Sequence, residues 1–180
     1  MSGKRAVFLD RDGVINQAII RDGKPYSPAT LDELVIVPGA RGSLDDLKQA
    51  GLMLIVVTNQ PDIARGLQTL GALEAIHAAL RQALPLDDFF LCAHDDSAHC
   101  DCRKPQPGLL FEASRKHDVD LSRSFMIGDR WRDVEAGANA GCVTVWIDSG
   151  YRERRSSVEP SATVNSLRAA ADWILALALS

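Results

Sequence analysis

Two aspartates separated by one residue follow the first apolar run of the chain. Asp10 and Asp12 lie in the segment FLDRDGVIN, and Gly13 after them allows the backbone to turn sharply. Two carboxylates this close repel each other unless one holds a proton or a cation lies between them. Mg²⁺ favours one or two carboxylates together with water and phosphate oxygens. The pattern predicts a magnesium site where Asp10 attacks phosphorus and Asp12 moves a proton; the alternative is a simple strand-end turn.

The elements that must position these carboxylates alternate along the 180 residues. Short apolar runs predict strands, and segments with helical periodicity between them predict helices. This order is typical of an α/β fold, a Rossmann-like three-layer sandwich with a mainly parallel sheet. Strands are expected at 6–10, 52–58, 89–93, 124–127 and 143–147, and helices at 39–50, 69–83, 107–117, 132–140 and from Asn165 or Ser166 to near the end.

Polar residues with chemical potential follow several of these strands. In open parallel sheets, ligands bind at the carboxyl ends of the strands. The residues that close a predicted strand are Asp10, Thr58, Cys92 and Asp129. Two inserts break the regular alternation, residues 13–37 and residues 92–102, and long connections in a compact domain are usually functional. We therefore expect the inserts to shape a site at this edge of the sheet.

The second insert holds a compact set of metal ligands. Three thiols and one imidazole within eleven residues make a closed tetrahedral set, which is typical of structural zinc. The expected ligands are Cys92, His94, Cys100 and Cys102. His99 competes with His94 for the nitrogen position, and unliganded loop cysteines are the alternative. Cys142, by contrast, is expected to be a small core residue.

Four motifs in order resemble those of the haloacid dehalogenase (HAD) superfamily. The first is D-x-D-G-V after the first strand, and the second is a Thr that ends a later strand. The third is a Lys near the start of a helix, and the fourth is an acidic pair after a strand. The matching residues after the first motif are Thr58 in VTNQ, Lys104 in CRKPQPG, and Asp129 and Asp133 in GDRWRD.

The resemblance implies a role for each matched residue. Asp10 is the nucleophile and Asp12 the general acid and base. Asp129 completes the Mg²⁺ site with the Asp10 carboxylate and the Asp12 backbone carbonyl, and Asp133 supports these ligands from behind. The residues implied to bind the transferring phosphoryl group are Thr58, Asn59 and Lys104. Phosphoryl transfer needs positioning and charge neutralisation, which these groups would supply.

Within the superfamily, the Cys/His loop together with T-N-Q and I-A-R-G resembles the histidinol-phosphate and heptose-bisphosphate phosphatase family. The likeness is greatest to the D-glycero-D-manno-heptose 1,7-bisphosphate phosphatases. The resemblance implies a compact fold without a separate cap domain and a sugar phosphate as substrate, bound partly by Arg103 and Arg130. Histidinol phosphate is the alternative substrate, since Asp62 would suit its ammonium group. Pro61-Asp62 and Trp131 depart from the usual family pattern.

Composition bears on the remaining classes of function. The net charge of −4 with no basic stripe argues against a nucleic-acid partner, and so against a DNA 3′-phosphatase that shares the first motif. A non-catalytic interaction module is disfavoured because every catalytic position is filled. The apolar tail at 169–179 is too short to span a membrane, and no secretory signal is visible. We expect one domain over residues 1–180, cytoplasmic and monomeric.

Overall fold

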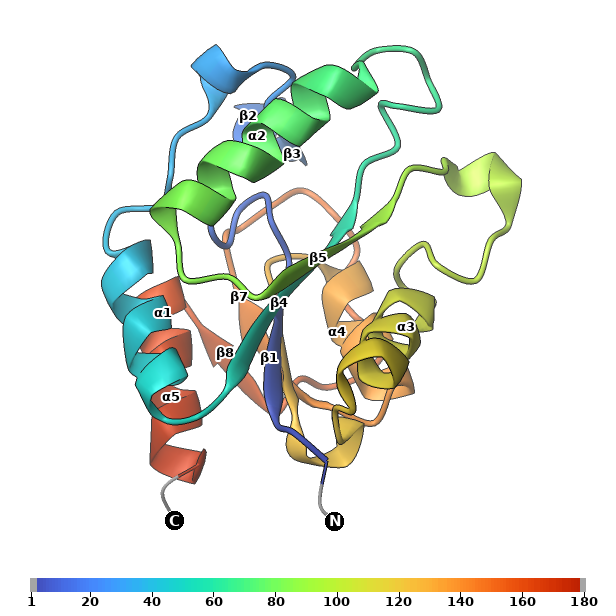
Figure 1. Cartoon of the computed structure of the whole chain (residues 1–180). Coiled ribbons are helices and arrows are strands. Elements are labelled where there is room, and N and C mark those ends of the chain that lie inside the picture. Colours follow the sequence, from blue (N-terminus) through green and yellow to red (C-terminus); the bar gives the residue numbers. More distant parts are fainter. Residues whose placement is uncertain (1–2, 179–180) are drawn as a thin grey trace.

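The computed structural model describes residues 3–178 and unites six strands of that range in one parallel sheet (Figure 1). The strand order is β5-β4-β1-β6-β7-β8, so β1 lies in the interior between β4 and β6. The strands are β1 (Ala6–Leu9), β4 (Met53–Asn59), β5 (Asp88–Cys92), β6 (Phe125–Gly128), β7 (Val143–Ile147) and β8 (Ala162–Val164). The central strands are apolar on both faces because helices cover both sides of the sheet.

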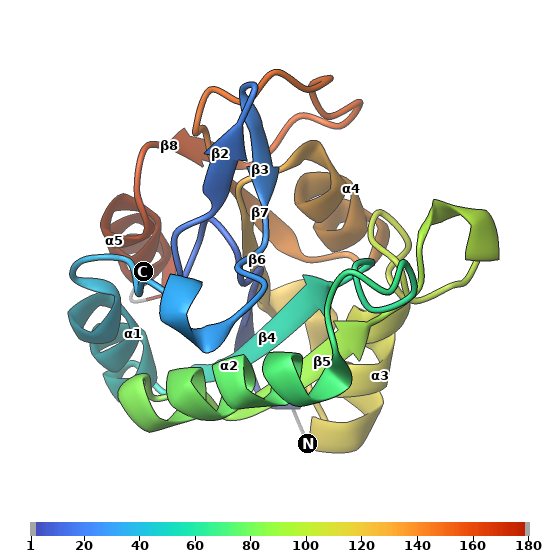
Figure 2. The same cartoon turned by 90° about the horizontal axis from the view of Figure 1, so that it is seen from above.

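Helices form the two outer layers (Figures 1 and 2). Alternate residues of β1 divide between two cores: Val7 and Leu9 face one side, and Ala6 and Phe8 face the other. The first core also holds side chains of α1 (Ala40–Gln49), α2 (Leu70–Ala83) and α5 (Leu167–Ala178), and the second those of α3 (Gly108–His117) and α4 (Trp131–Asn139). The predicted three-layer α/β sandwich with a parallel sheet is therefore confirmed.

Every predicted strand and helix is present, with bounds that differ by a residue or two. Ser166 rather than Asn165 caps the last helix, because its Oγ accepts a hydrogen bond from the Ala169 amide at 3.2 Å. Three short 3₁₀ helices were not predicted: η1 (Leu31–Glu33), η2 (Asp96–Ala98) and η3 (Leu121–Arg123). Strand β8 was also not predicted, since it has only three residues and follows a polar loop.

The insert after β1 folds into a small antiparallel hairpin, β2 (Ile19–Arg21) and β3 (Lys24–Tyr26). Figure 2, which looks onto the carboxyl edge of the sheet, shows this hairpin and the loop after β5 standing on that edge. The described chain adds no separate cap domain to the sheet. None of the helices within residues 3–178 combines the length and apolar character that a membrane crossing requires.

Candidate active site

The strand order brings the predicted motifs to one place. Because β4 and β6 flank β1, their carboxyl ends put Thr58 and Asp129 on either side of Asp10. The Asp10 amide donates to the Ile127 carbonyl at 3.0 Å, which continues the pairing of β1 with β6 beyond the last strand residue. The first carboxylate is therefore fixed by the sheet itself rather than by a free loop.

Lys104 joins two of these carboxylates. Its side chain is 2% exposed, and Nζ donates to Oδ1 of Asp10 at 2.8 Å and to Oδ1 of Asp133 at 2.6 Å. Burial alone would lower the pKa of this lysine, but the charges of Asp10 and Asp133 outweigh burial and raise it to about 12. Lys104 is therefore a cation at neutral pH, and its binding of the phosphoryl group stays a prediction.

Asn59 determines where Lys104 lies. The Asn59 side chain accepts a hydrogen bond from the Lys104 amide at 3.0 Å and donates to the Lys104 carbonyl at 3.1 Å. This two-way pairing fixes the backbone of a residue 45 positions further along the chain. Binding of the phosphoryl group by Asn59 stays a prediction; its contact in this structure is with the lysine.

Three carboxylates gather next to Lys104. Oxygens of Asp10, Asp129 and Asp133 lie within 4.8 Å of one another, and all three side chains are buried. Burial and the neighbouring Asp133 raise the pKa of Asp10 to about 6, despite the opposing charge of Lys104. Burial and the charges of Asp10 and Asp133 likewise raise the pKa of Asp129 well above its usual value. The single positive charge of Lys104 does not balance three carboxylates, and a bound metal cation would supply the missing positive charge.

The donor set fits a divalent metal such as Mg²⁺. Oδ1 of Asp129 is buried and has no hydrogen-bond partner among residues 3–178. Buried polar atoms normally have a partner, and a carboxylate oxygen of this kind is a suitable ligand for a cation. Asp133 differs, because Lys104 donates to its Oδ1 and the Arg130 amide to its Oδ2 at 3.0 Å. Both of its oxygens accept hydrogen bonds from the protein, and its supporting position behind the metal ligands stays a prediction.

Asp12 lies in a cage of hydrogen-bond donors. Its two oxygens accept from Arg11, Asn16, Ser27 and Gln60 at distances between 2.7 and 3.1 Å. Burial would raise the pKa of Asp12, but the Arg11 charge and these hydrogen bonds outweigh it and lower the pKa. Asp12 is therefore held as a carboxylate, oriented by donors on three different segments of the chain.

Asp12 nevertheless faces the same space as the other carboxylates. Asp10, Asp12, Asn59 and Lys104 all line one small cavity of about 50 Å³ at the carboxyl edge of the sheet. Thr58 is 1% exposed and does not line this cavity; its Oγ1 accepts a hydrogen bond from Gln60 Nε2 at 2.9 Å. Phosphoryl binding by Thr58 stays a prediction.

The two arginines predicted to bind substrate lie at the rim. Arg103 pairs with Asp96 at 2.9 Å and donates to the His94 carbonyl at 3.2 Å. Arg130 forms a two-point ion pair with Glu153. A second cavity of about 210 Å³ opens beside the first and carries five cations and three carboxylates: Lys24, Arg65, Arg103, Arg130, Arg132, Asp62, Asp96 and Glu153.

The four predicted zinc ligands converge in the loop after β5. Ligand atoms of Cys92, His94, Cys100 and Cys102 lie within 4.8 Å of one another. Sγ of Cys92 and Sγ of Cys102 are 2.9 Å apart, and His94 presents Nδ1 at 3.4 Å from Cys102. His99 is not part of this group. Cys142 is buried in the second core, as predicted.

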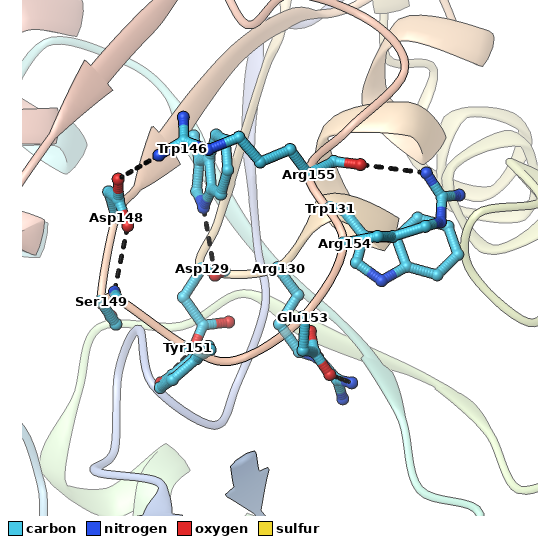
Figure 3. Close-up of a pocket in the computed structure, with 11 residues that line it drawn as sticks. Asp129, Arg130, Trp131, Trp146, Asp148, Ser149, Tyr151, Glu153, Arg154 and Arg155 are labelled. Carbon is cyan, nitrogen blue, oxygen red and sulfur yellow. Dashed lines mark hydrogen bonds and ion pairs between the residues drawn. The ribbon is translucent and has the colours of Figure 1, made fainter. Parts of the chain in front are cut away.

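Sequence reasoning missed several residues that surround the carboxylates. Arg11 stands between the two predicted aspartates in the sequence, so its position was a signal; it is fully buried and also contacts His77 at 3.2 Å. Trp146 and Tyr151 gave no signal, because Trp146 lies within β7 and Tyr151 in the loop after it, outside every motif. Figure 3 shows them around Asp129: the Tyr151 hydroxyl donates to Oδ2 at 2.6 Å, and the Trp146 indole to the backbone carbonyl at 3.1 Å.

Comparison with known proteins places the chain. A family model described as HAD-hydrolase-like matches residues 101–170. A D-glycero-beta-D-manno-heptose-1,7-bisphosphate 7-phosphatase of Photorhabdus laumondii is 39% identical over 92% of each chain. The enzyme of the same name from Bordetella bronchiseptica is 38% identical over 81% of this chain and 82% of its own.

Solved structures agree with the sequence relatives. The D,D-heptose 1,7-bisphosphate phosphatase of B. bronchiseptica, complexed with magnesium and phosphate, superposes with a TM-score of 0.79 at 32% identity, covering 96% of this chain and 99% of that chain. The Burkholderia thailandensis enzyme of the same name gives a TM-score of 0.67 at 25% identity, with the same coverage of both chains. The chain therefore belongs to the HAD-like hydrolases, in the D-glycero-D-manno-heptose-1,7-bisphosphate 7-phosphatase family.

Proposed function

We propose that this chain is a Mg²⁺-dependent phosphatase that removes the 7-phosphate of D-glycero-D-manno-heptose 1,7-bisphosphate. The observation that carries the proposal is the buried group of Asp10, Lys104, Asp129 and Asp133 at the carboxyl edge of the sheet. The relatives named for this activity support the choice of substrate. Their names specify the beta anomer, which we propose for this chain as well.

Asp10 and Asp129 are the side chains that would hold Mg²⁺, with the backbone carbonyl of Asp12. A bound Mg²⁺ would neutralise charge on the phosphoryl oxygens and on the carboxylates that surround it. Magnesium is present in the B. bronchiseptica structure, which supports this assignment. In this chain, the support is the unpartnered Oδ1 of Asp129 and the uncompensated charge of the buried carboxylates.

Asp10 attacks phosphorus in the first half of the proposed reaction. A bond forms between an Asp10 carboxylate oxygen and phosphorus while the bond from phosphorus to the sugar oxygen breaks. Asp12 donates a proton to the leaving sugar oxygen. Because the hydrogen bonds around Asp12 favour its ionised form, bound substrate must weaken them so that Asp12 first takes up this proton. The Lys104 ammonium stays hydrogen-bonded to Asp10 and neutralises the negative charge that develops on the transferring phosphoryl group.

Water completes the cycle in the second half. Asp12, now a carboxylate again, takes a proton from water as the water oxygen attacks the phosphorus of the aspartyl-phosphate. The bond between phosphorus and Asp10 breaks, and inorganic phosphate and free Asp10 result. The donors around Asp12 favour its ionised form, which is the form that this step needs.

The cationic cavity beside the carboxylates supports a substrate with a second phosphate. Its five cations exceed its three carboxylates by two, and Arg103 and Arg130 are among them. Asp62 lines the same cavity but pairs with Arg65 at 3.5 Å, so its charge is partly balanced within the protein. This pairing weakens the argument from Asp62 for histidinol phosphate as the substrate.

The Cys/His loop supports a structural zinc site, which we propose as a second metal centre. Four protein ligands close a tetrahedral site and leave no position for substrate. Thiolate ligands need a reducing compartment, so we place the reaction in the cytoplasm. We further propose that residues 1–180 act as one domain and as a monomer.

Phosphate release from a panel of substrates tests the proposal. The panel holds both anomers of the heptose bisphosphate, sugar monophosphates and histidinol phosphate, each with Mg²⁺ and with EDTA. We expect the bisphosphate to be preferred, with turnover lost in EDTA and in Asp10→Asn, and ³¹P NMR to show that the 1-phosphate remains on the product. A preference for histidinol phosphate would overturn the substrate, and turnover that persists in Asp10→Asn would overturn the mechanism.

A further inference from the structure

The two carboxylate oxygens of Asp129 have different surroundings, and Tyr151 makes the difference. The phenol donates to Oδ2 at 2.6 Å, while Oδ1 is buried without a partner among the described residues. One oxygen of this carboxylate is therefore occupied by the protein, and one is left for a cation.

The surroundings of Asp129 hold this division in place. The Trp146 indole donates to the Asp129 backbone carbonyl at 3.1 Å. A Cβ atom built on Gly13 would lie 1.8 Å from Oδ2 of Asp129 and 2.9 Å from the Tyr151 hydroxyl, so the turn after Asp12 packs directly against this pair. The carboxylate has little room to turn its second oxygen toward the site.

The loop that carries Tyr151 is held by ion pairs to α4 and to Arg130, the residue before α4 (Figure 3). Glu153 pairs with Arg130, and Arg154 donates to Glu135 at 2.9 Å. The guanidinium of Arg154 also lies over the Trp131 ring, 3.3 Å from its centroid. These contacts keep the phenol at a fixed position relative to Asp129.

We infer that Tyr151 is a positioning residue that makes Asp129 bind its cation through a single oxygen, and that it thereby favours Mg²⁺ over Ca²⁺. Mg²⁺ requires about six ligands at short distance in near-octahedral geometry, which single carboxylate oxygens and waters satisfy. Ca²⁺ takes about six to eight oxygens and often binds both oxygens of one carboxylate. A carboxylate with one oxygen already bonded to a phenol is therefore a better ligand for the smaller ion.

The inference rests on the proposed function, since it concerns the same metal site, but metal binding tests it without substrate. Tyr151→Phe removes the hydroxyl and keeps the ring. Titration calorimetry with MgCl₂ and with CaCl₂ gives the two dissociation constants in the absence of phosphate. Loss of a group that orients a metal ligand typically weakens metal binding about 10–100-fold, and we expect a loss of about 10-fold for Mg²⁺.

Ca²⁺ affinity should fall less or rise in the variant, so that the ratio of the two constants shifts toward Ca²⁺. Arg155→Gln is the matched control, because Arg155 lies on the same loop, is largely exposed, and pairs with Asp148 rather than Asp129. The control should keep the wild-type ratio. The thermal midpoint in EDTA measures any general effect of each change on the fold.

An unchanged ratio in Tyr151→Phe overturns the inference, whether both affinities stay at the wild-type value or both fall together with the thermal midpoint. A purely structural tyrosine would give one of those two results. Failure of the wild-type chain to bind Mg²⁺ would overturn the proposed metal site and this inference together. Normal wild-type binding with an unaltered variant would overturn the role of Tyr151 alone.

Discussion

Nζ of Lys104 lies 2.8 Å from Oδ1 of Asp10, although 94 residues separate the two along the chain. The same ammonium lies 2.6 Å from Oδ1 of Asp133, so one buried cation contacts both the proposed nucleophile and the second aspartate of the fourth motif, in the first turn of α4. This contact ties three of the four motifs into one unit. The Lys104 ammonium, which is proposed to neutralise the substrate phosphate, therefore also stabilises the folded protein without substrate.

Lys104→Met should abolish most activity and also destabilise the protein. Removing the cation leaves Asp10 and Asp133 buried without their partner, and breaking a buried ion pair costs about 3–5 kcal/mol. We expect kcat to fall by at least about 100-fold, as for loss of a group that stabilises transition-state charge. Phosphate release and urea unfolding measure the two effects.

Lys116→Met is the matched control for that experiment. Lys116 is 58% exposed and pairs with Asp88 far from the carboxylates. Surface pairs contribute about 0–1 kcal/mol, so stability and turnover should stay near wild type. Equal turnover in both lysine variants would contradict the role given to Lys104.

Gly13→Ala should impair both the fold and the metal site. Gly13 has φ of +85°, which disfavours an L side chain by about 1–2 kcal/mol, and the added Cβ would lie 1.8 Å from Oδ2 of Asp129. We expect weaker Mg²⁺ binding and a lower thermal midpoint. Gly42→Ala is the control, because Gly42 lies in helix α1 with open space around it, and there alanine should stabilise by up to about 1 kcal/mol. Equal midpoints for the two variants would argue against a close approach at Gly13.

His77 should make stability depend on pH in the mildly acidic range. Burial and the charge of Arg11 lower its pKa from 6.5 to about 4. The unfolded chain therefore binds a proton that the folded chain refuses, and stability falls as pH drops from 6.5 toward 4. The difference of about 2.5 pKa units corresponds to a loss of up to about 3 kcal/mol.

Urea unfolding at several pH values measures this effect. In His77→Gln the fall in stability between pH 6.5 and 4 should be smaller than in wild type. His99→Asn replaces an exposed histidine and should leave the wild-type slope unchanged. A His77→Gln variant with the full wild-type slope would show that other groups cause the acid sensitivity.

Cys100→Ser should remove the proposed zinc ion and loosen the loop that leads to Lys104. Loss of one of four ligands weakens structural zinc binding strongly, and binding energy in such sites is folding energy. We expect about one zinc per wild-type chain by atomic absorption and much less in the variant. Cys142→Ala, which changes a buried core thiol outside the group, should keep its zinc. A wild-type protein purified without any zinc, and unable to take it up, would contradict the assignment.

The alternation of apolar runs predicted the sheet and placed Asp10, Thr58 and Asp129 at its carboxyl edge. This worked because β4 and β6 are the neighbours of β1, so a strand-end position in sequence is a site position in space. The cluster of three cysteines and one histidine was predictable for a different reason, since all four residues lie within one short segment. Both of these arrangements depend on local signals, which a single sequence contains.

Residues that act from distant segments carried no such signal. Tyr151 reaches Asp129 only because the loop after β7 turns back over the site, and Ser27 reaches Asp12 only because the hairpin folds over β1. Neither contact has a spacing or a residue type that distinguishes it from an ordinary loop. Arg11 was visible beside the two aspartates, but its burial and its bond to His77 depend on how α2 packs.

Trapping the covalent intermediate tests the central claim most directly. The heptose bisphosphate is mixed with the enzyme and Mg²⁺, quenched in acid within one turnover, and reduced with borohydride, which converts an aspartyl-phosphate to homoserine. We predict homoserine at position 10 by peptide mass spectrometry, and none without substrate. Rapid phosphate release with residue 10 always recovered as aspartate, or with the modification on another carboxylate, would contradict the account.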